Sequence, residues 1–479
     1  MAERLSALDT MFLDLEEADD GATMHFGAIL VFDRPRGSTV PDIDRVRRHV
    51  ELRLHELPHY RMQLSRQRAS RLSWTTWDSP QRFDVAAHVA HVTLPGPGGD
   101  AELQEWFGDF LSHRVDRRRP LWEMALVDGL AGGRWALATK IHHCLVDGMG
   151  SVDLGQILLD PEPTSPRHPR PTGHWDIAPH SAEHTTLKRL YPESLIRGAK
   201  AGAGALRHPA DTLASGAAIG DLVVHEELIA APECSLNRPL SATRGYRAVS
   251  FALDDIKAIE RALGGTVNDV VLGISAGALR HLLLERGETP PEAGLRAQIP
   301  VDIRTADHAR AVGNVLTSLF VELPVAEADP LARYRQVAER AESLKKSPQP
   351  IGGKALIDLA GLAPPLLGQL LGRAMFGGDR VFNLTITNVR ASATPLYAFG
   401  GRLREILPYV PLFSQHSVGI AVVSYAGRLV FGLGADRTTT PDLGVLAEGV
   451  EASFEELRQV AQEGRAKRPQ PRARQEQRR

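Results

Sequence analysis

Residues 135–148 read Trp135-Ala-Leu-Ala-Thr-Lys-Ile-His-His-Cys-Leu-Val-Asp-Gly148, and this stretch constrains the fold more than any other. The apolar run predicts a strand that ends at two adjacent histidines, after which Asp147-Gly148 turns the chain into a helix. Adjacent side chains at a strand end point in opposite directions, so one imidazole can face a cleft while the other is packed. An imidazole of ordinary pKa, about 6.5, is the usual general base near neutral pH, so the pattern favours acid–base chemistry.

Other interpretations of the same residues stay open. His142, His143 and Asp147 could together hold a metal ion, although no further group of cysteine, histidine or acidic residues at ligand spacing supports one. Cys144 could be a thiol nucleophile, although its side chain and that of His143 diverge on an extended segment. A histidine at a strand end is also commonly structural.

The spacing His142-His143-x-x-x-Asp147-Gly148 resembles the active-site signature of the CoA-dependent acyltransferase superfamily, which includes chloramphenicol acetyltransferase and peptide-synthetase condensation domains. Three further segments resemble the bacterial wax ester synthase/diacylglycerol acyltransferase family. They are Pro120-Leu-Trp122, Asn268-Asp269 and the opening Leu5-Ser-Ala-Leu-Asp-Thr-Met-Phe12. The likeness runs from about Leu5 to about Glu456, nearly the whole chain.

At 479 residues the chain is too long for one ordinary core. The resemblance implies an α/β fold of two chloramphenicol-acetyltransferase-like domains, joined by a long crossover, with a tunnel between them. We expect an N-terminal domain over residues 1–175 that carries the two histidines, and a crossover linker over 176–235. A C-terminal domain over 236–463 and a disordered basic tail over 464–479 complete the expected organisation.

Hydrophobic periodicity and turn residues predict the individual elements. Ser6 is the expected N-cap of the first helix, and Thr266 or Asn268 caps a later one. The expected helices cover residues 5–15, 42–57, 103–114, 266–279 and 447–460. The expected strands cover 24–32, 120–127, 134–142, 247–253, 295–304, 315–323, 420–423 and 428–433.

Composition excludes several classes of protein. A net charge of −2 does not favour nucleic acid or an anionic membrane, and 43% hydrophobic with 24% charged residues is typical of soluble globular proteins. Cys144 and Cys234 form no disulfide framework, and Met1 to Arg4 lead into Leu5 without the apolar core of a signal peptide. We therefore expect a cytoplasmic protein.

The most apolar long stretch covers residues 355–376, but two prolines and two charged residues interrupt the ~20 apolar residues that a membrane span needs. Its second half carries an apolar stripe formed by Leu366, Leu367, Leu370, Leu371 and Met375. This stripe could dock on lipid or could pack against the second domain. The first alternative predicts peripheral association with the inner membrane face or with lipid droplets.

The resemblance implies an O-acyltransferase that moves a fatty acyl group from acyl-CoA to a diacylglycerol or a long-chain alcohol. His143 is the implied general base, and His142, Asp147 and Gly148 complete the catalytic motif. Acyl-CoA is a substrate, and no metal or bound prosthetic group is expected. Two alternatives stay open: an acyltransferase for a polyketide or other secondary-metabolite alcohol, and a non-catalytic protein that binds lipid surfaces.

Two asparagines are candidates for contacting substrate or the oxyanion. Asn268 lies at the start of an expected helix, where a polar side chain can meet an oxygen of the substrate, or can be an ordinary cap. Asn388 lies in Thr385-Ile-Thr-Asn-Val389, which resembles an Asn-Val-Pro segment of the family. Here Arg390 replaces the proline, which changes the stiffness and the charge of this segment.

Three residues are expected to support the site from outside it. The resemblance implies that Arg304 pairs with Asp147, although an ordinary solvated arginine at a strand end is the alternative. Trp122 is large enough to bury about 150–250 Å² and to anchor the sheet. Asp269 completes the Asn-Asp pair of the family.

Overall fold

The computed structural model describes residues 3–35, 37, 39–65, 75–79, 82–145, 158–163, 230–302, 316–345 and 381–466. Several of the predicted features lie outside these residues. They are Asp147, Gly148, Arg304, the apolar stretch 355–376, nearly all of the crossover linker and most of the basic tail.

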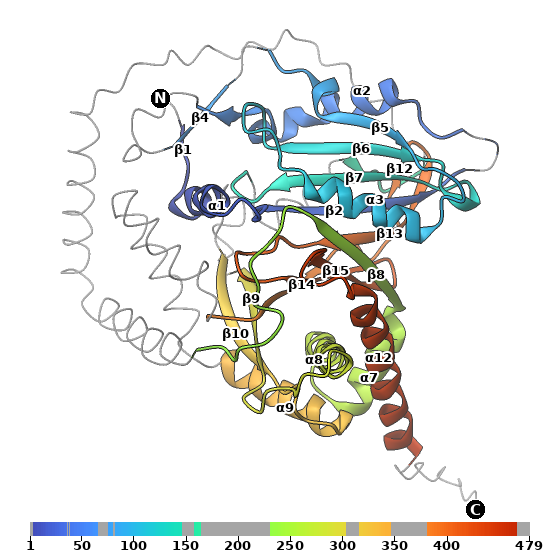
Figure 1. Ribbon diagram of the computed structural model, residues 1–479. Helices are drawn as coiled ribbons and strands as arrows, with labels where there is room; N and C mark the ends of the chain where they lie inside the picture. The colour runs from blue at the N-terminus through green and yellow to red at the C-terminus, as the bar shows by residue number, and fades with distance from the viewer. Residues whose placement is uncertain are drawn as a thin grey trace, which may run out of the picture.

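The first half of the described chain is built on a six-stranded sheet (Figure 1). In spatial order its strands are β12 (Tyr397–Ala398), β13 (Gly401–Tyr409), β2 (His25–Asp33), β7 (Trp135–His142), β6 (Trp122–Asp128) and β5 (Val89–Thr93). Its helices are α1 (Ala7–Ala18), α2 (Ile43–Arg53) and α3 (Asp100–Ser112). A small sheet of β1 (Glu3–Arg4), β4 (Thr76–Asp78) and β3 (Gln63–Leu64) lies at the N-terminus.

Alternating residues of β2 divide the core into two layers, as the two-residue period of a strand requires. Leu30 and Phe32 pack in the cluster that contains the buried residues of α1 and α2. Ile29 and Val31 pack in the cluster that contains those of α3, together with Tyr246 from the second half of the chain. Both faces of this sheet are therefore covered, and one of them meets the second half directly.

The strands predicted over residues 120–127 and 134–142 are confirmed as β6 and β7. β6 and β7 pair antiparallel, with Trp122 opposite Ile141, and β2 pairs with β7 on its other side, with His25 opposite His142. Every residue of β7 is buried. The strand that delivers the histidines is thus a central one, held by a neighbour on each edge.

The second half is built on another six-stranded sheet, with helices packed on it (Figure 1). In spatial order its strands are β10 (Leu316–Leu323), β9 (Leu295–Asp302), β11 (Leu384–Arg390), β14 (Val418–Tyr425), β15 (Arg428–Asp436) and β8 (Arg244–Ala252). Its helices are α7 (Leu253–Leu263), α8 (Val267–Glu285), α9 (Pro330–Lys345) and α12 (Leu443–Ala466).

Helix α8 is long and apolar enough to cross a membrane by length and composition, and it is the one such helix among the described residues. Its most apolar window is 72% buried inside the protein. Its buried residues form much of the core cluster of the second half. This is the pattern of a central core helix.

Sheet membership does not follow the expected division at residue 236. β12 and β13 come late in the chain but complete the first sheet, where β13 pairs antiparallel with β2. The two sheets lie close together, because a Cβ added at Gly432 on β15 would lie 1.8 Å from the Pro408 carbonyl oxygen on β13. Only glycine fits there without displacing the backbone.

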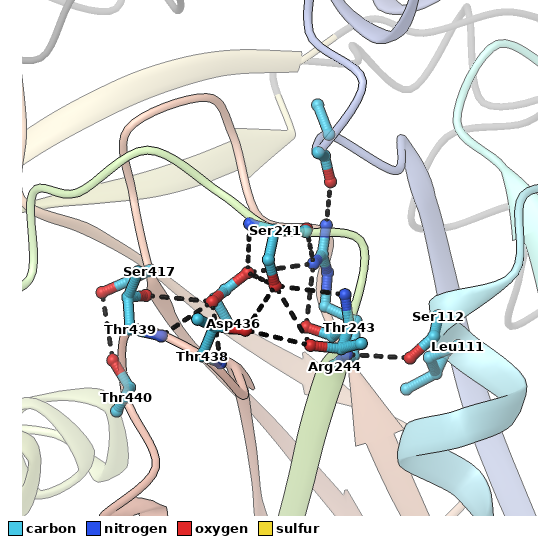
Figure 2. Close-up of polar contacts among 12 residues, drawn as sticks. Leu111, Ser112, Ser241, Thr243, Arg244, Ser417, Asp436, Thr438, Thr439 and Thr440 are labelled. Atoms are coloured by element: carbon cyan, nitrogen blue, oxygen red, sulfur yellow. Dashed lines mark hydrogen bonds and ion pairs between the residues drawn. The ribbon is translucent and has the colours of Figure 1, made fainter.

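A buried polar cluster also joins the two halves at the start of β8 (Figure 2). Arg244 Nη1 lies 3.4 Å from Asp436 Oδ2, and both side chains are fully buried. The Arg244 backbone N–H donates to Ser112 Oγ of α3 at 2.8 Å, and its guanidinium donates to the Gly21 carbonyl. One arginine therefore ties the second sheet to two separate segments of the first half.

Candidate active site

The two histidines are held through their backbone from opposite sides. The His142 N–H donates to the Leu121 carbonyl at 2.9 Å, next to the start of β6. The His143 N–H donates to the Met24 carbonyl at 2.8 Å, next to the start of β2. β7 therefore ends in a position that both neighbouring strands define.

His142 is fully buried, and its two ring nitrogens have different environments. Nδ1 accepts the backbone N–H of Cys144 at 3.1 Å, so the proton of a neutral ring lies on Nε2. Nε2 lies 3.5 Å from Glu16 Oε2 on α1. His142 is therefore turned into the protein, toward an acidic partner.

Glu16 is the centre of a buried network that the sequence analysis missed. Its Oε1 accepts the Met24 N–H at 3.1 Å, and its Oε2 accepts Nε and Nη2 of Arg117 at 3.0 and 2.7 Å. Burial by itself would raise the pKa of the Glu16 carboxyl, but the contacts with His142 and Arg117 outweigh it and hold that pKa well below its usual range. The network thus contains an ionised carboxylate.

His143 faces a different environment from its neighbour, and it is only partly buried. Its ring stacks on Phe12 of α1, with centroids 4.0 Å apart and planes 23° apart. Phe26 of β2 meets the same ring edge-on, with centroids 5.6 Å apart and planes 85° apart. Two aromatic side chains therefore set the plane of the imidazole.

Trp122 lies at the start of β6, beside the residues that hold His142. Its indole Nε1 donates to the Tyr60 carbonyl at 2.7 Å, and its ring stacks on His88 with centroids 4.5 Å apart. The side chain is fully buried in the same core cluster as Cys144 and Phe12. These contacts hold the indole in the core, and the role of Trp122 in supporting the site stays a prediction.

The structure brings Asn268 and Asn388 together on the second half of the chain. Asn388 Nδ2 on β11 donates to Asn268 Oδ1 in the first turn of α8 at 3.2 Å. The N-cap of α8 is Thr266, and Asp269 completes the capping box from position N3. Asn268 is therefore not the cap, whereas Asp269 has a defined structural part in starting the helix.

Cys144 has the surroundings of a structural thiol. It is fully buried beside the histidines, and burial raises the pKa of its thiol well above the usual range. A thiol held in its protonated form is a poor nucleophile. Its burial thus weighs against an acyl-cysteine intermediate.

The remaining predicted site residues divide into two groups. Arg390, which replaces a proline of the family pattern, is exposed at the end of β11. The pairing of Asp147 with Arg304 and the turn at Gly148 fall outside the described ranges and stay predictions. Within those ranges, no group of three or more histidine, cysteine or acidic side chains could hold a metal ion.

Comparison with known proteins identifies relatives along nearly the entire chain. A Mycobacterium tuberculosis protein named a diacylglycerol O-acyltransferase is 30% identical over 463 residues, with 95% of each chain covered. A Mycobacterium bovis protein, also named for diacylglycerol O-acyltransferase activity, is 31% identical over 467 residues, covering 94% of this chain and 98% of the relative.

Two solved structures share the fold. The wax ester synthase/diacylglycerol acyltransferase of Marinobacter aquaeolei VT8 is 27% identical, with a TM-score of 0.69, and the match covers 96% of this chain and 100% of that one. The first condensation domain of the calcium-dependent antibiotic synthetase is 17% identical, with a TM-score of 0.61 over 96% of this chain and 97% of that one. The second likeness concerns the fold alone. The two-domain α/β fold implied by the resemblance is confirmed.

Family models cover both halves of the chain. Residues 5–271 match the wax ester synthase/diacylglycerol acyltransferase catalytic domain, and residues 312–458 match the C-terminal domain of the same enzymes. The chain therefore belongs to the wax ester synthase/diacylglycerol acyltransferase family.

Proposed function

We propose that this protein is an acyl-CoA-dependent O-acyltransferase in which His143 is the general base. The observation that carries the proposal is the contrast between the two histidines. His142 is buried against Glu16, whereas His143 is partly exposed and oriented by Phe12 and Phe26. Of the two, His143 is the one that can reach a substrate.

The chemistry needs one proton to move twice. Neutral His143 takes the proton of the acceptor hydroxyl while the oxygen attacks the thioester carbonyl. The tetrahedral intermediate then collapses, the carbon–sulfur bond breaks, and protonated His143 returns the proton to the sulfur of CoA. Such acid–base catalysis typically contributes about 10²–10⁴-fold. The thioester already carries an activated acyl group, so we propose that no cofactor takes part.

We propose a diacylglycerol as the principal acceptor and a long-chain alcohol as the second. The proposal is supported by the mycobacterial relatives, which are named as diacylglycerol O-acyltransferases. The Marinobacter relative is named for both activities, which keeps the alcohol as a candidate.

Purified protein with palmitoyl-CoA should release free CoA when diolein is added, more slowly when hexadecanol is added, and not at all without an acceptor. The product of each reaction should be the corresponding triacylglycerol or wax ester, identified by mass spectrometry. Release with hexadecanol alone would make the protein a wax ester synthase. An absence of release with both acceptors, but release with a polyketide alcohol, would overturn the choice of substrate class.

We further propose that the enzyme works at a lipid surface, because a triacylglycerol or wax ester is insoluble in water. The apolar stripe in residues 366–375 supports this proposal from the sequence. Co-sedimentation with phosphatidylcholine vesicles that contain diolein should weaken when Leu367 and Leu371 are replaced by glutamine. Unchanged sedimentation of this variant, with its thermal unfolding unaltered, would assign the stripe to the protein interior.

A further inference from the structure

Helix α1 contacts both histidines of the motif from one face. Phe12 and Glu16 are four residues apart, so their side chains lie on the same side of the helix, one turn apart. Phe12 stacks on His143, and Glu16 lies against His142. A single short helix thus reaches two adjacent residues whose side chains point in different directions.

Glu16 also reaches His143 through the backbone of Met24, the residue before β2. Its carboxylate accepts the Met24 N–H, and the Met24 carbonyl accepts the His143 N–H. The carboxylate is anchored in turn by two hydrogen bonds from Arg117, which also donates to the Leu13 carbonyl of α1 at 3.0 Å. The position of His143 therefore depends on Glu16 along a path that is independent of His142.

We propose that Phe12 and Glu16 are positioning residues for catalysis, and that α1 is the element that sets the geometry of the general base. Phe12 fixes the plane of the His143 ring. Glu16 fixes the backbone of His143 through Met24 and also holds the side chain of the adjacent His142. The inference rests on the proposed role of His143 as the base. It adds to that role two residues that do not themselves touch the reacting atoms.

Physical considerations indicate why a general base needs this support. The torsion that rotates an imidazole is broad, so the side chain alone does not fix the direction of its nitrogens. A base must lie within about 2.6–3.2 Å of the proton that it takes, and a misplacement of about 1 Å can cost 10²-fold. An aromatic face 4.0 Å from the ring also attracts the imidazolium that forms when His143 accepts the proton.

The first test compares two substitutions at Phe12. Phe12→Leu keeps an apolar side chain but removes the stack, and we expect kcat to fall about 10-fold with the KM for palmitoyl-CoA unchanged. Phe12→Tyr keeps the ring and should restore most of kcat. Phe32→Leu is the matched control, because Phe32 is a fully buried residue of β2 whose ring stacks on Trp135 with centroids 4.2 Å apart. It should lower thermal stability and leave kcat unchanged.

The second test compares two neighbouring acids. Glu16→Gln and Glu17→Gln remove the same charge, and both carboxylates bind Arg117, but the side chain of Glu17 is 54% exposed against 1% for Glu16. We expect Glu16→Gln to lower kcat about 10-fold or more, again with little change in KM. Glu17→Gln should behave like the unmodified enzyme.

The outcomes separate the inference from the proposed function. If His143→Ala stays active, His143 is not the base and the proposed function fails. If His143→Ala is inactive while Phe12→Leu and Glu16→Gln keep full kcat, Phe12 and Glu16 are not positioning residues, and the assignment of His143 as the general base stands. A loss of kcat in Phe12→Leu that Phe32→Leu matches, at an equal fall in Tm, would likewise overturn the inference.

Discussion

His143→Ala should lower kcat by at least about 100-fold while leaving the fold intact, because only the positioning of the two substrates remains once the base is removed. The side chain is partly exposed and lies at the end of β7, so its loss leaves no large cavity in the core. The measurement is release of CoA from palmitoyl-CoA with diolein, together with thermal unfolding of the purified variant.

His142→Ala is the informative comparison, because it changes the adjacent residue on the other side of the chain. Its loss leaves the ionised Glu16 without one partner but keeps the two hydrogen bonds from Arg117. We expect a smaller loss of activity than in His143→Ala and a larger loss of stability. If His143→Ala kept more than about a tenth of kcat, against the 100-fold or greater contribution of a base, His143 would not be the general base.

Asp436→Ala is expected to lower the free energy of unfolding by about 3–5 kcal/mol, because it leaves the buried guanidinium of Arg244 without its counter-ion. Asp436 also accepts the N–H and hydroxyl of Ser241 at 2.6 and 2.8 Å, and these donors lose their acceptor as well (Figure 2). Asp436→Asn keeps the size of the side chain and should cost less. Denaturant unfolding of each variant measures the difference.

A surface ion pair is the control for this experiment. On α12, Arg458 Nη2 lies 2.5 Å from Glu455 Oε2, and the side chains of Glu455 and Arg458 are 55% and 48% exposed. Glu455→Ala should therefore cost no more than about 1 kcal/mol, the usual limit for an exposed pair. If Asp436→Ala cost as little, the buried cluster would not contribute to joining the two halves.

Elements with strong local signals could be predicted from the sequence. The capping box of α1 begins at Ser6, as expected, because a serine followed three residues later by an acid satisfies the first backbone N–H groups of a helix. The β6–β7 hairpin and the β14–β15 hairpin at Ala426-Gly427 can also be predicted from sequence, because in each a glycine-containing turn separates two apolar runs. In each case the decisive residues are neighbours in the chain.

Strand β13 was not predicted, because its sequence lacks the pattern of a strand. Its charges break the apolar alternation, and Pro408 cannot donate a hydrogen bond within a sheet. The structure resolves the conflict, because β12 pairs with only Gly401 and Arg402 of β13. Pro408 therefore lies where β13 is an edge strand and needs no N–H for a further neighbour. Its carbonyl accepts a hydrogen bond from the hydroxyl of Tyr246 at 3.0 Å.

At the candidate site, the histidine motif could be predicted but its support could not. Nothing in the sequence separates Glu16 from Glu17, although one is buried against Arg117 and His142 and the other is largely exposed. The charged and ring partners of Glu16, Arg117 and His142, lie more than a hundred positions away along the chain. A contact of that kind is created by the fold and leaves no local pattern.

The pairing of β13 with β2 also governs the order in which the chain can fold. During synthesis, residues 25–142 provide four of the six strands of the first sheet, and β13 closes it only after residue 409 has been made. Until then this edge of β2 lacks the partner that it has in the described part of the chain, and an unpaired strand edge can pair with other chains. The matched segments 5–271 and 312–458 therefore share one sheet, so the first segment alone lacks the strand that pairs with β2.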